Sequence, residues 1–370
     1  MQQRRDTSGG GLEQVRKSVL LDGLDVRTQR GVEFGPLDCP MVAKSDGHIL
    51  YIDYTTAEEL RAKHGHRPGK DPAAIVEVDR LWDEALPRVL RDDLPLDYAV
   101  ASHVIEHVPD LVGWLGEVAQ VLRPGGRLCL AVPDKRYTFD RRREPSDLAA
   151  VMSAHLQGLR KPSPWQVFDH HYKVVQLPLR EAWQGRLDPA GLSRIHDFGY
   201  ALSQAQKARD GAYVDCHCWV FTPFSFLELM AELAGHGLAP YRLAAFHETR
   251  PNTFEFYACL ECEPAILSDH GRREEAAASF RSRLPWYGAS EPGQPTNQDL
   301  LVLLQALGRR IEAAEGQARE IQASLARVNA ELGEVRRALD PAGLRPGGTA
   351  RPMGSWLGNL ASRLRPWRAG

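Results

Sequence analysis

The stretch that decides the fold is residues 96–140, LDYAVASHVIEHVPDLVGWLGEVAQVLRPGGRLCLAVPDKRYTFD. It contains two continuous apolar runs, at 96–102 and 127–133, which are typical of parallel strands buried on both faces. Between them, residues 111–122 carry apolar side chains at helical spacing and end in Arg-Pro-Gly-Gly, a helix stop followed by a turn. Strand, helix and strand in this order predict one crossover unit of a doubly wound α/β sheet.

The same alternation of apolar runs and helical patterns continues on both sides of this stretch. Candidate strands lie at 32–34, 49–53 and 75–79 before it, and at 241–247 and 253–262 after it. The last two are joined by a hairpin-length connection, so we expect an antiparallel pair there. The whole pattern predicts one α/β domain with a largely parallel sheet.

The first strand turn suggests a nucleoside site. Gly35 follows the first candidate strand, and Asp53 ends the second one 18 residues later. A glycine there lets a ligand approach the backbone, and an acid at the next strand tip can bind ribose hydroxyls. The turn has no GxGxxG loop and contains Pro36 and Asp38. This favours a ligand with a ribose but no pyrophosphate, and it disfavours a nicotinamide-dependent oxidoreductase.

Residues 96–134 resemble the class I S-adenosylmethionine-dependent methyltransferases, type 11-like. The resemblance is carried by the motif SHVIEHV at the end of the first strand, by LRPGG after the helix and by VPD at the end of the second strand. The resemblance covers residues 32–262 and implies a seven-stranded Rossmann-like sheet with S-adenosylmethionine as cofactor. In the first motif, Pro36-Leu37-Asp38 stand where the family usually has further glycines. The cofactor-binding residues that the resemblance implies are Glu33, Gly35, Asp53, Asp79, Ser102, His103 and His107.

The pattern breaks between residues 140 and 220, which predicts an inserted lid in the catalytic domain. Its Asp/His clusters admit three interpretations: a general base for an acceptor hydroxyl, a divalent metal site for a sugar diol, or structural caps. The base and the structural role are favoured over the metal. The cysteine pairs argue against zinc, because Cys259 and Cys262 would point to opposite faces of a strand. The candidate catalytic residues are Asp169, His170 and His217.

The termini predict further parts. Residues 1–11 are polar and glycine-rich, which is typical of disorder, and the methyltransferase domain is expected over 12–267. After a predicted linker at 268–296, residues 297–340 carry an unbroken heptad seam, which predicts a coiled coil and a homo-oligomer. The tail at 341–370 has five Arg, no acid and apolar residues at helical spacing. We expect its residues 353–368 to contact a membrane surface or a glycosyltransferase.

The composition narrows the function. The net charge of −2 over 370 residues disfavours a nucleic-acid partner, and six cysteines are too few for a disulfide scaffold. The sequence has no run of about 20 apolar residues, the length that a membrane-spanning helix needs. We therefore expect a cytoplasmic protein that is peripheral at the membrane. The leading hypothesis is O-methylation of a sugar or glycan hydroxyl, as in surface-polysaccharide synthesis. The alternative is a catalytically inactive scaffold that acts through its coiled coil.

Overall fold

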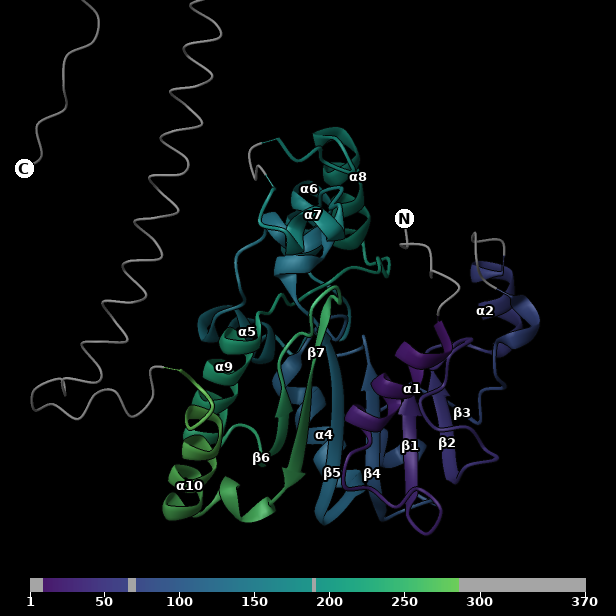
Figure 1. The fold of residues 1–370 in the computed structure, drawn as a ribbon, viewed down its shortest axis with the longest axis vertical. Helices are drawn as coiled ribbons and strands as arrows, with labels where there is room; N and C mark the ends of the chain where they lie inside the picture. The colour runs from purple at the N-terminus through teal and green to yellow at the C-terminus, as the bar shows by residue number, and fades with distance from the viewer. Residues whose placement is uncertain (1–8, 66–70, 188–190, 286–370) are drawn as a thin grey trace, which may run out of the picture. The chain divides into compact units, whose positions relative to one another are not determined.

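The computed structural model describes residues 9–65, 71–187 and 191–285. Within these residues, seven strands form one sheet in the order β3-β2-β1-β4-β5-β7-β6 (Figure 1). Strands β3, β2, β1, β4 and β5 pair in parallel, and β7 pairs antiparallel with both β5 and β6. The predicted α/β sheet and its closing antiparallel hairpin are therefore confirmed.

The elements follow the predicted alternation closely. The strands are β1 (Arg30–Phe34), β2 (His48–Asp53), β3 (Arg80–Leu81), β4 (Leu96–Ser102), β5 (Leu122–Pro133), β6 (Tyr241–His247) and β7 (Glu255–Cys262). The α-helices of the described residues are α1 (Gly9–Leu20), α2 (Ala57–His64), α3 (Leu86–Val89), α4 (Leu111–Val121), α5 (Leu148–Leu156), α6 (Pro164–Lys173), α7 (Leu179–Trp183), α8 (Phe198–Arg209), α9 (Pro223–Gly235) and α10 (His270–Arg281).

The third strand lies later in the chain than predicted. The apolar run at 75–79 is not a strand, and the chain joins the edge of β2 only from Asp79, whose N–H donates to the Tyr51 carbonyl over 2.8 Å. Ile75 is buried, and Val76 packs against the core on the α1 side of the sheet. The run is apolar because these two side chains pack, and it does not need strand geometry to do so.

Two hydrophobic cores cover the two faces of the sheet. Successive strand residues point to opposite faces, so Ala99 and Ala101 of β4 pack with α4 and α9, while Tyr98 and Val100 pack on the side of α1. Helix α4 begins after Asp110, whose carboxylate accepts the N–H of the third helical residue. Buried on both faces, β4 and β5 form a rigid base for the loops at their carboxyl ends.

The insert lies over the carboxyl ends of the parallel strands, with α6, α7 and α8 above the sheet (Figure 1). Its last segment is tied to the loop after β4. The backbone N–H groups of Cys218 and Trp219 both donate to the Glu106 carbonyl, over 2.6 and 3.1 Å, and the Trp219 indole donates to the Val108 carbonyl over 2.7 Å. This is the edge at which ligands bind in open α/β sheets.

The chain ends differ in part from their predictions. Helix α10 lies inside the predicted linker, which is wrong for these residues, because Ala276, Ala277 and Phe280 form a narrow buried stripe against α9 and β6. Gly9 to Gly11, predicted as disordered, begin α1. The predicted coiled coil at 297–340 and tail at 341–370 lie outside the described residues. Among the helices that are described, none is long and apolar enough to cross a membrane.

Candidate functional site

Gly35 and Asp53 lie next to each other where β1 and β2 end. The Gly35 backbone has a left-handed φ of 56°, and its N–H donates to the Ile52 carbonyl over 2.9 Å. A Cβ added at Gly35 would lie 3.9 Å from Asp53 Oδ2 and 3.8 Å from Val104 Cγ2. The loop after β1, the tip of β2 and the loop after β4 therefore meet at one point, as a nucleoside site at this edge requires.

The Asp53 carboxylate is placed to accept hydrogen bonds from ribose hydroxyls. Its side chain is buried, and burial raises the pKa of Asp53 to about 6. Oδ1 accepts the N–H of Tyr54 over 2.8 Å, whereas Oδ2 takes no hydrogen bond from a described residue and faces Gly35. This edge thus fits the ribose of S-adenosylmethionine.

The predicted cofactor residue Glu33 has a different environment. Its carboxylate lies among buried residues, accepting the N–H of Met41 over 2.7 Å and that of Val42 over 3.1 Å. Burial raises the pKa of Glu33 to about 7, although these hydrogen bonds oppose the rise. Both oxygens close the loop after β1 and are not turned toward the Gly35 edge, so cofactor binding by Glu33 stays a prediction.

Asp79 also lies away from the strand tips. Because β3 begins later than predicted, the backbone of Asp79 bonds to Tyr51 in β2, and Tyr51 lies two residues before the strand tip at Asp53. Its Oδ2 accepts the N–H of Tyr51 over 2.8 Å, and its Oδ1 lies 2.5 Å from Lys44 Nζ. The structure therefore does not bring Asp79 together with Asp53, and its predicted contact with the adenine stays untested.

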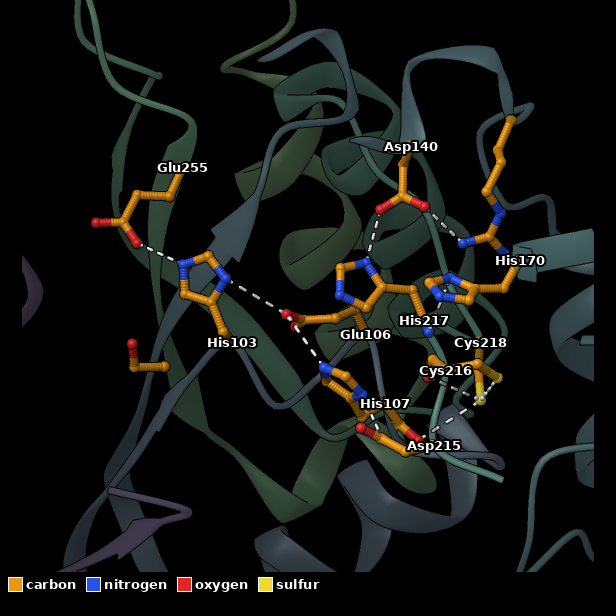
Figure 2. Close-up of polar contacts among 12 residues, drawn as sticks. His103, Glu106, His107, Asp140, His170, Asp215, Cys216, His217, Cys218 and Glu255 are labelled. Atoms are coloured by element: carbon orange, nitrogen blue, oxygen red, sulfur yellow. Dashed lines mark hydrogen bonds and ion pairs between the residues drawn. The ribbon is translucent and has the colours of Figure 1, made fainter. Parts of the chain in front are cut away.

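Ser102 and His103, at the end of β4, belong to a network of ion pairs. Arg16 of α1 donates to Ser102 Oγ over 2.6 Å and contacts both Glu255 oxygens, at 2.6 and 2.9 Å. His103 Nε2 lies 2.6 Å from Glu255 Oε2 (Figure 2). Burial opposes protonation of His103, but Glu106 and Glu255 outweigh it and raise the His103 pKa to about 9. His103 has a φ of 56°, in the left-handed region that few residues other than glycine adopt and that recurs at functional sites.

A second cluster lies beside His103 and joins the loop after β4 to the insert (Figure 2). His107 Nδ1 lies 2.9 Å from Asp215 Oδ1, and His217 Nδ1 lies 2.6 Å from Asp140 Oδ2. The two imidazole rings meet edge to face, with centroids 4.7 Å apart. Glu106 lies against this pair, with Oε1 3.9 Å from His107 Nε2. We call Glu106, His107 and His217 with Asp140 and Asp215 the imidazole cluster.

The charges of the imidazole cluster are strongly perturbed. Burial opposes protonation of His107, yet Asp215 and Glu106 raise its pKa to about 9. Burial likewise opposes ionisation of Asp140, but His217 and Arg143 hold its pKa well below its usual range. Strongly shifted groups collected at the carboxyl edge of a sheet are typical of a catalytic site.

The three predicted catalytic residues have different places around this cluster. His217 belongs to it, and the backbone N–H of His217 donates to His170 Nδ1 over 3.3 Å. Burial lowers the pKa of His170 well below its usual value, and His217 adds to this. Asp169 is bound from the other side, 2.8 Å from Arg143 Nε and 2.5 Å from Lys173 Nζ. The structure therefore brings His217 and His170 together and leaves Asp169 to support Arg143.

Sequence reasoning did not assign Asp140 or Asp215 to the site. Both were visible in the motifs TFD and VDCHC, but nothing local tells which aspartate faces a histidine. Asp140 and His217 are 77 positions apart and meet only because the insert folds back. Arg16 and Glu255 were missed for the same reason, since Arg16 reaches Ser102 from α1 and Glu255 reaches His103 from β7.

Parts of this chain are similar to known proteins. A family model described as "Methyltransferase domain" matches residues 49–235, about half of the chain. An uncharacterized 37.1 kDa protein in transposon TN4556 of Streptomyces fradiae is 34% identical over 125 residues, which are 32% of this chain and 34% of that protein. The chain thus spans about a third of the length of this curated relative.

The solved structures that match the chain have low sequence identity and low TM-scores. A putative S-adenosylmethionine dependent methyltransferase from Listeria monocytogenes is 12% identical, with a TM-score of 0.37, over 70% of this chain and 100% of that one. One from Mesorhizobium loti is 15% identical, with a TM-score of 0.31, over 68% and 98%. The CcbJ methyltransferase from Streptomyces caelestis is 12% identical, with a TM-score of 0.34, over 67% and 89%. The family assignment rests on the family model, which includes both β4 and the loop that carries Glu106 and His107.

Proposed function

Since the chain belongs to the methyltransferase domain family, we propose that it transfers the methyl group of S-adenosylmethionine to a hydroxyl group of a sugar or glycan. The bound cofactor supplies a methyl group on a positively charged sulfur. The chain must hold the acceptor oxygen in line with that methyl carbon and remove the hydroxyl proton as the new bond forms. A site for such an acceptor needs groups that handle a proton beside the cofactor edge.

The observation that carries the proposal is the imidazole cluster beside the end of β4. The buried Asp140 carboxylate fixes His217 at Nδ1, which leaves Nε2 as the atom that can accept a proton or bind a cation. Asp215 fixes His107 in the same way. Two oriented imidazoles next to a carboxylate suit activation of a hydroxyl, which is too weak a nucleophile in its neutral form.

Aromatic side chains of the insert support a sugar as the acceptor. Tyr213 is about half exposed, its ring stacks with that of Tyr54 at 6.3 Å, and its hydroxyl lies 3.5 Å from Asp215 Oδ1. Tyr200 is also exposed, and its ring contacts His171, which in turn contacts His170. Flat aromatic faces next to a few fixed polar groups are suited to the apolar face and the hydroxyls of a sugar ring.

The test starts with cofactor binding. Calorimetry with S-adenosylmethionine should give a measurable affinity for the wild type and none for Asp53→Ala. Asp210→Ala serves as control because this exposed carboxylate pairs only with its neighbour Arg209 among the described residues. Unchanged affinity in Asp53→Ala would contradict the placement of the cofactor. Absence of any affinity in the wild type would favour the inactive scaffold instead.

The second step tests the acceptor. Mass spectrometry after incubation with nucleotide sugars and glycan fractions should find a methyl group on a sugar oxygen. His217→Ala should lose this transfer while its affinity for S-adenosylmethionine stays unchanged, and the exposed His236→Ala should keep both. Transfer to a nitrogen or carbon atom would contradict the proposal.

The C-terminal region carries a separate part of the proposal. The heptad seam at 297–340 would hold several copies together, and the tail at 353–368 would bring them to a membrane or to a glycosyltransferase. Light scattering should show a smaller species when residues from 297 onward are deleted. Vesicles of anionic lipid should float the full chain but not a chain that ends at residue 352, and equal flotation would contradict a role of the tail.

A further inference from the structure

Three side chains of the imidazole cluster converge on one point. Glu106, His107 and His217 each place a ligand atom within 4.8 Å of those of the other two. They come from the loop after β4 and from the last segment of the insert, which the two backbone hydrogen bonds to the Glu106 carbonyl hold together. We propose that this trio binds one divalent transition-metal ion.

The donor set and its surroundings suit such an ion. Two imidazole nitrogens and one carboxylate are ligands of Zn²⁺, Fe²⁺, Mn²⁺ and Co²⁺, and three protein ligands leave coordination positions open. Asp215 contacts Nδ1 of His107 and Asp140 contacts Nδ1 of His217, so Nε2 is the atom of each ring that is left to bind an ion, and on His107 the ion would replace the Nε2 proton. Metal-binding histidines nearly always have such a carboxylate, carbonyl or water at the other nitrogen.

Glu106 supplies an independent observation. Its side chain is fully buried, and neither carboxylate oxygen has a hydrogen bond from a described residue. Glu106 Oε1 lies 3.5 Å from His103 Nδ1 and 3.9 Å from His107 Nε2, and both distances are beyond good hydrogen-bond length. The imidazoles of His103 and His107 balance the charge of Glu106 without donating a good hydrogen bond to it, and a cation bound in place of the His107 Nε2 proton would contact the carboxylate directly.

The buried cysteines next to this trio do not belong to the site. Cys218 Sγ is directed to the carbonyl of His107, at 3.5 Å, and lies 4.0 Å from Cys216 Sγ. With no thiolate among the ligands, the trio suits an ion that binds substrate oxygens in its open positions. It is distinct from the cysteine-based zinc site that the sequence disfavoured.

The place of the trio gives the ion a use. Glu106 adjoins His103, so the open positions would lie beside the edge that is predicted to hold the methionine part of the cofactor (Figure 2). Two neighbouring hydroxyls of a sugar could occupy them, and the ion would lower the pKa of the hydroxyl to be methylated. This role rests on the proposed function, whereas metal binding itself does not.

The test measures metal binding without cofactor or acceptor. The full-length protein is stripped with a chelator and titrated with Co²⁺ and, separately, with Zn²⁺ and Mn²⁺. We expect one ion per chain by elemental analysis and, for Co²⁺, a visible ligand-field absorption band. Glu106→Gln and His217→Ala should each weaken binding by at least about 100-fold, and Asp140→Asn, which keeps all three ligands, by about 10–100-fold.

The control is His155→Ala, because His155 also pairs with a carboxylate, Asp110 at 3.1 Å, but lies outside the trio. Thermal unfolding of each variant checks that it folds. The inference is overturned if the stripped wild type binds none of the three ions stoichiometrically, or if folded Glu106→Gln and His217→Ala bind as tightly as His155→Ala. Stoichiometric binding without methylation of any sugar would reject the proposed acceptor and leave the metal site standing.

Discussion

Replacing Arg143 with methionine should destabilise the fold strongly. The Arg143 side chain is 1% exposed, and its guanidinium joins two carboxylates, with Nη1 2.8 Å from Asp140 Oδ1 and Nε 2.8 Å from Asp169 Oδ2. Methionine keeps an unbranched apolar stem and removes both ion pairs. Removing one partner of a buried ion pair costs about 3–5 kcal/mol, because the other charge stays buried. We expect the free energy of unfolding to fall by that amount.

A matched control separates burial from the loss of an arginine. Arg160 Nη1 also lies 2.8 Å from a carboxylate, Glu117 Oε1, but the Arg160 side chain is 63% exposed. Exposed pairs contribute about 0–1 kcal/mol, so Arg160→Met should change stability little. Both variants are measured by denaturant unfolding near neutral pH. Equal, small losses would refute the reasoning that the ion pairs of Arg143 are buried away from water.

The pH dependence gives a second readout on the same variant. His217 and Arg143 hold the pKa of Asp140 below its usual value of 3.8 in spite of burial. A carboxyl pKa that is depressed by folding adds stability that is complete above the unfolded pKa and disappears as the pH falls through the folded one. Arg143→Met removes one of the two groups that lower this pKa, so the difference in the free energy of unfolding between the variant and the wild type should narrow below about pH 4. A difference that widens there would contradict the assignment.

Three further changes test other parts of the chain. Gly35→Ala should lower the free energy of unfolding by about 1–2 kcal/mol, because alanine is strained at this positive φ although its Cβ would not clash with any neighbour. Calorimetry should also show weaker binding of S-adenosylmethionine to this variant. As the pH falls below the Asp53 pKa of about 6, cofactor affinity should drop by up to about tenfold per pH unit, and Asp53→Asn should remove this dependence. Phe280→Ala in α10 should cost about 3–5 kcal/mol in denaturant unfolding, whereas the exposed Phe198→Ala should cost little.

The centre of the fold could be predicted from the sequence because burial there leaves a local pattern. Strand β4 packs on both faces, so its residues from Tyr98 to Ala101 are all apolar and read as a continuous run. The edge strand β3 has no such pattern. Only Arg80 and Leu81 pair with β2, and both are exposed, so the apolar residues before them predicted the strand too early.

The candidate site could be predicted only where its residues share a motif. Gly35 and His107 lie in loops that follow strands, and Asp53 ends β2; the order of the strands brings Gly35 and Asp53 together. Asp140 and Asp215 meet their histidines through the path of the insert, which no periodicity encodes. The local sequence around a lone aspartate in an irregular segment does not show whether that aspartate caps a helix or orients an imidazole.

The burial of so many charges is itself evidence about the insert. Replacing a buried ion pair with apolar side chains of similar size is often neutral or stabilising, so stability alone does not explain Arg143, Asp140 and His217 in one interior. The sequence of contacts explains why these charges are buried together: Arg143 holds Asp140, and Asp140 fixes the ring of His217. Each contact orients the next group, and the series ends at the ring facing Glu106, a buried carboxylate with no hydrogen bond from the described residues. An interior built in this way is expected where a ligand completes it, which is why the trio is the place to look for a bound ion.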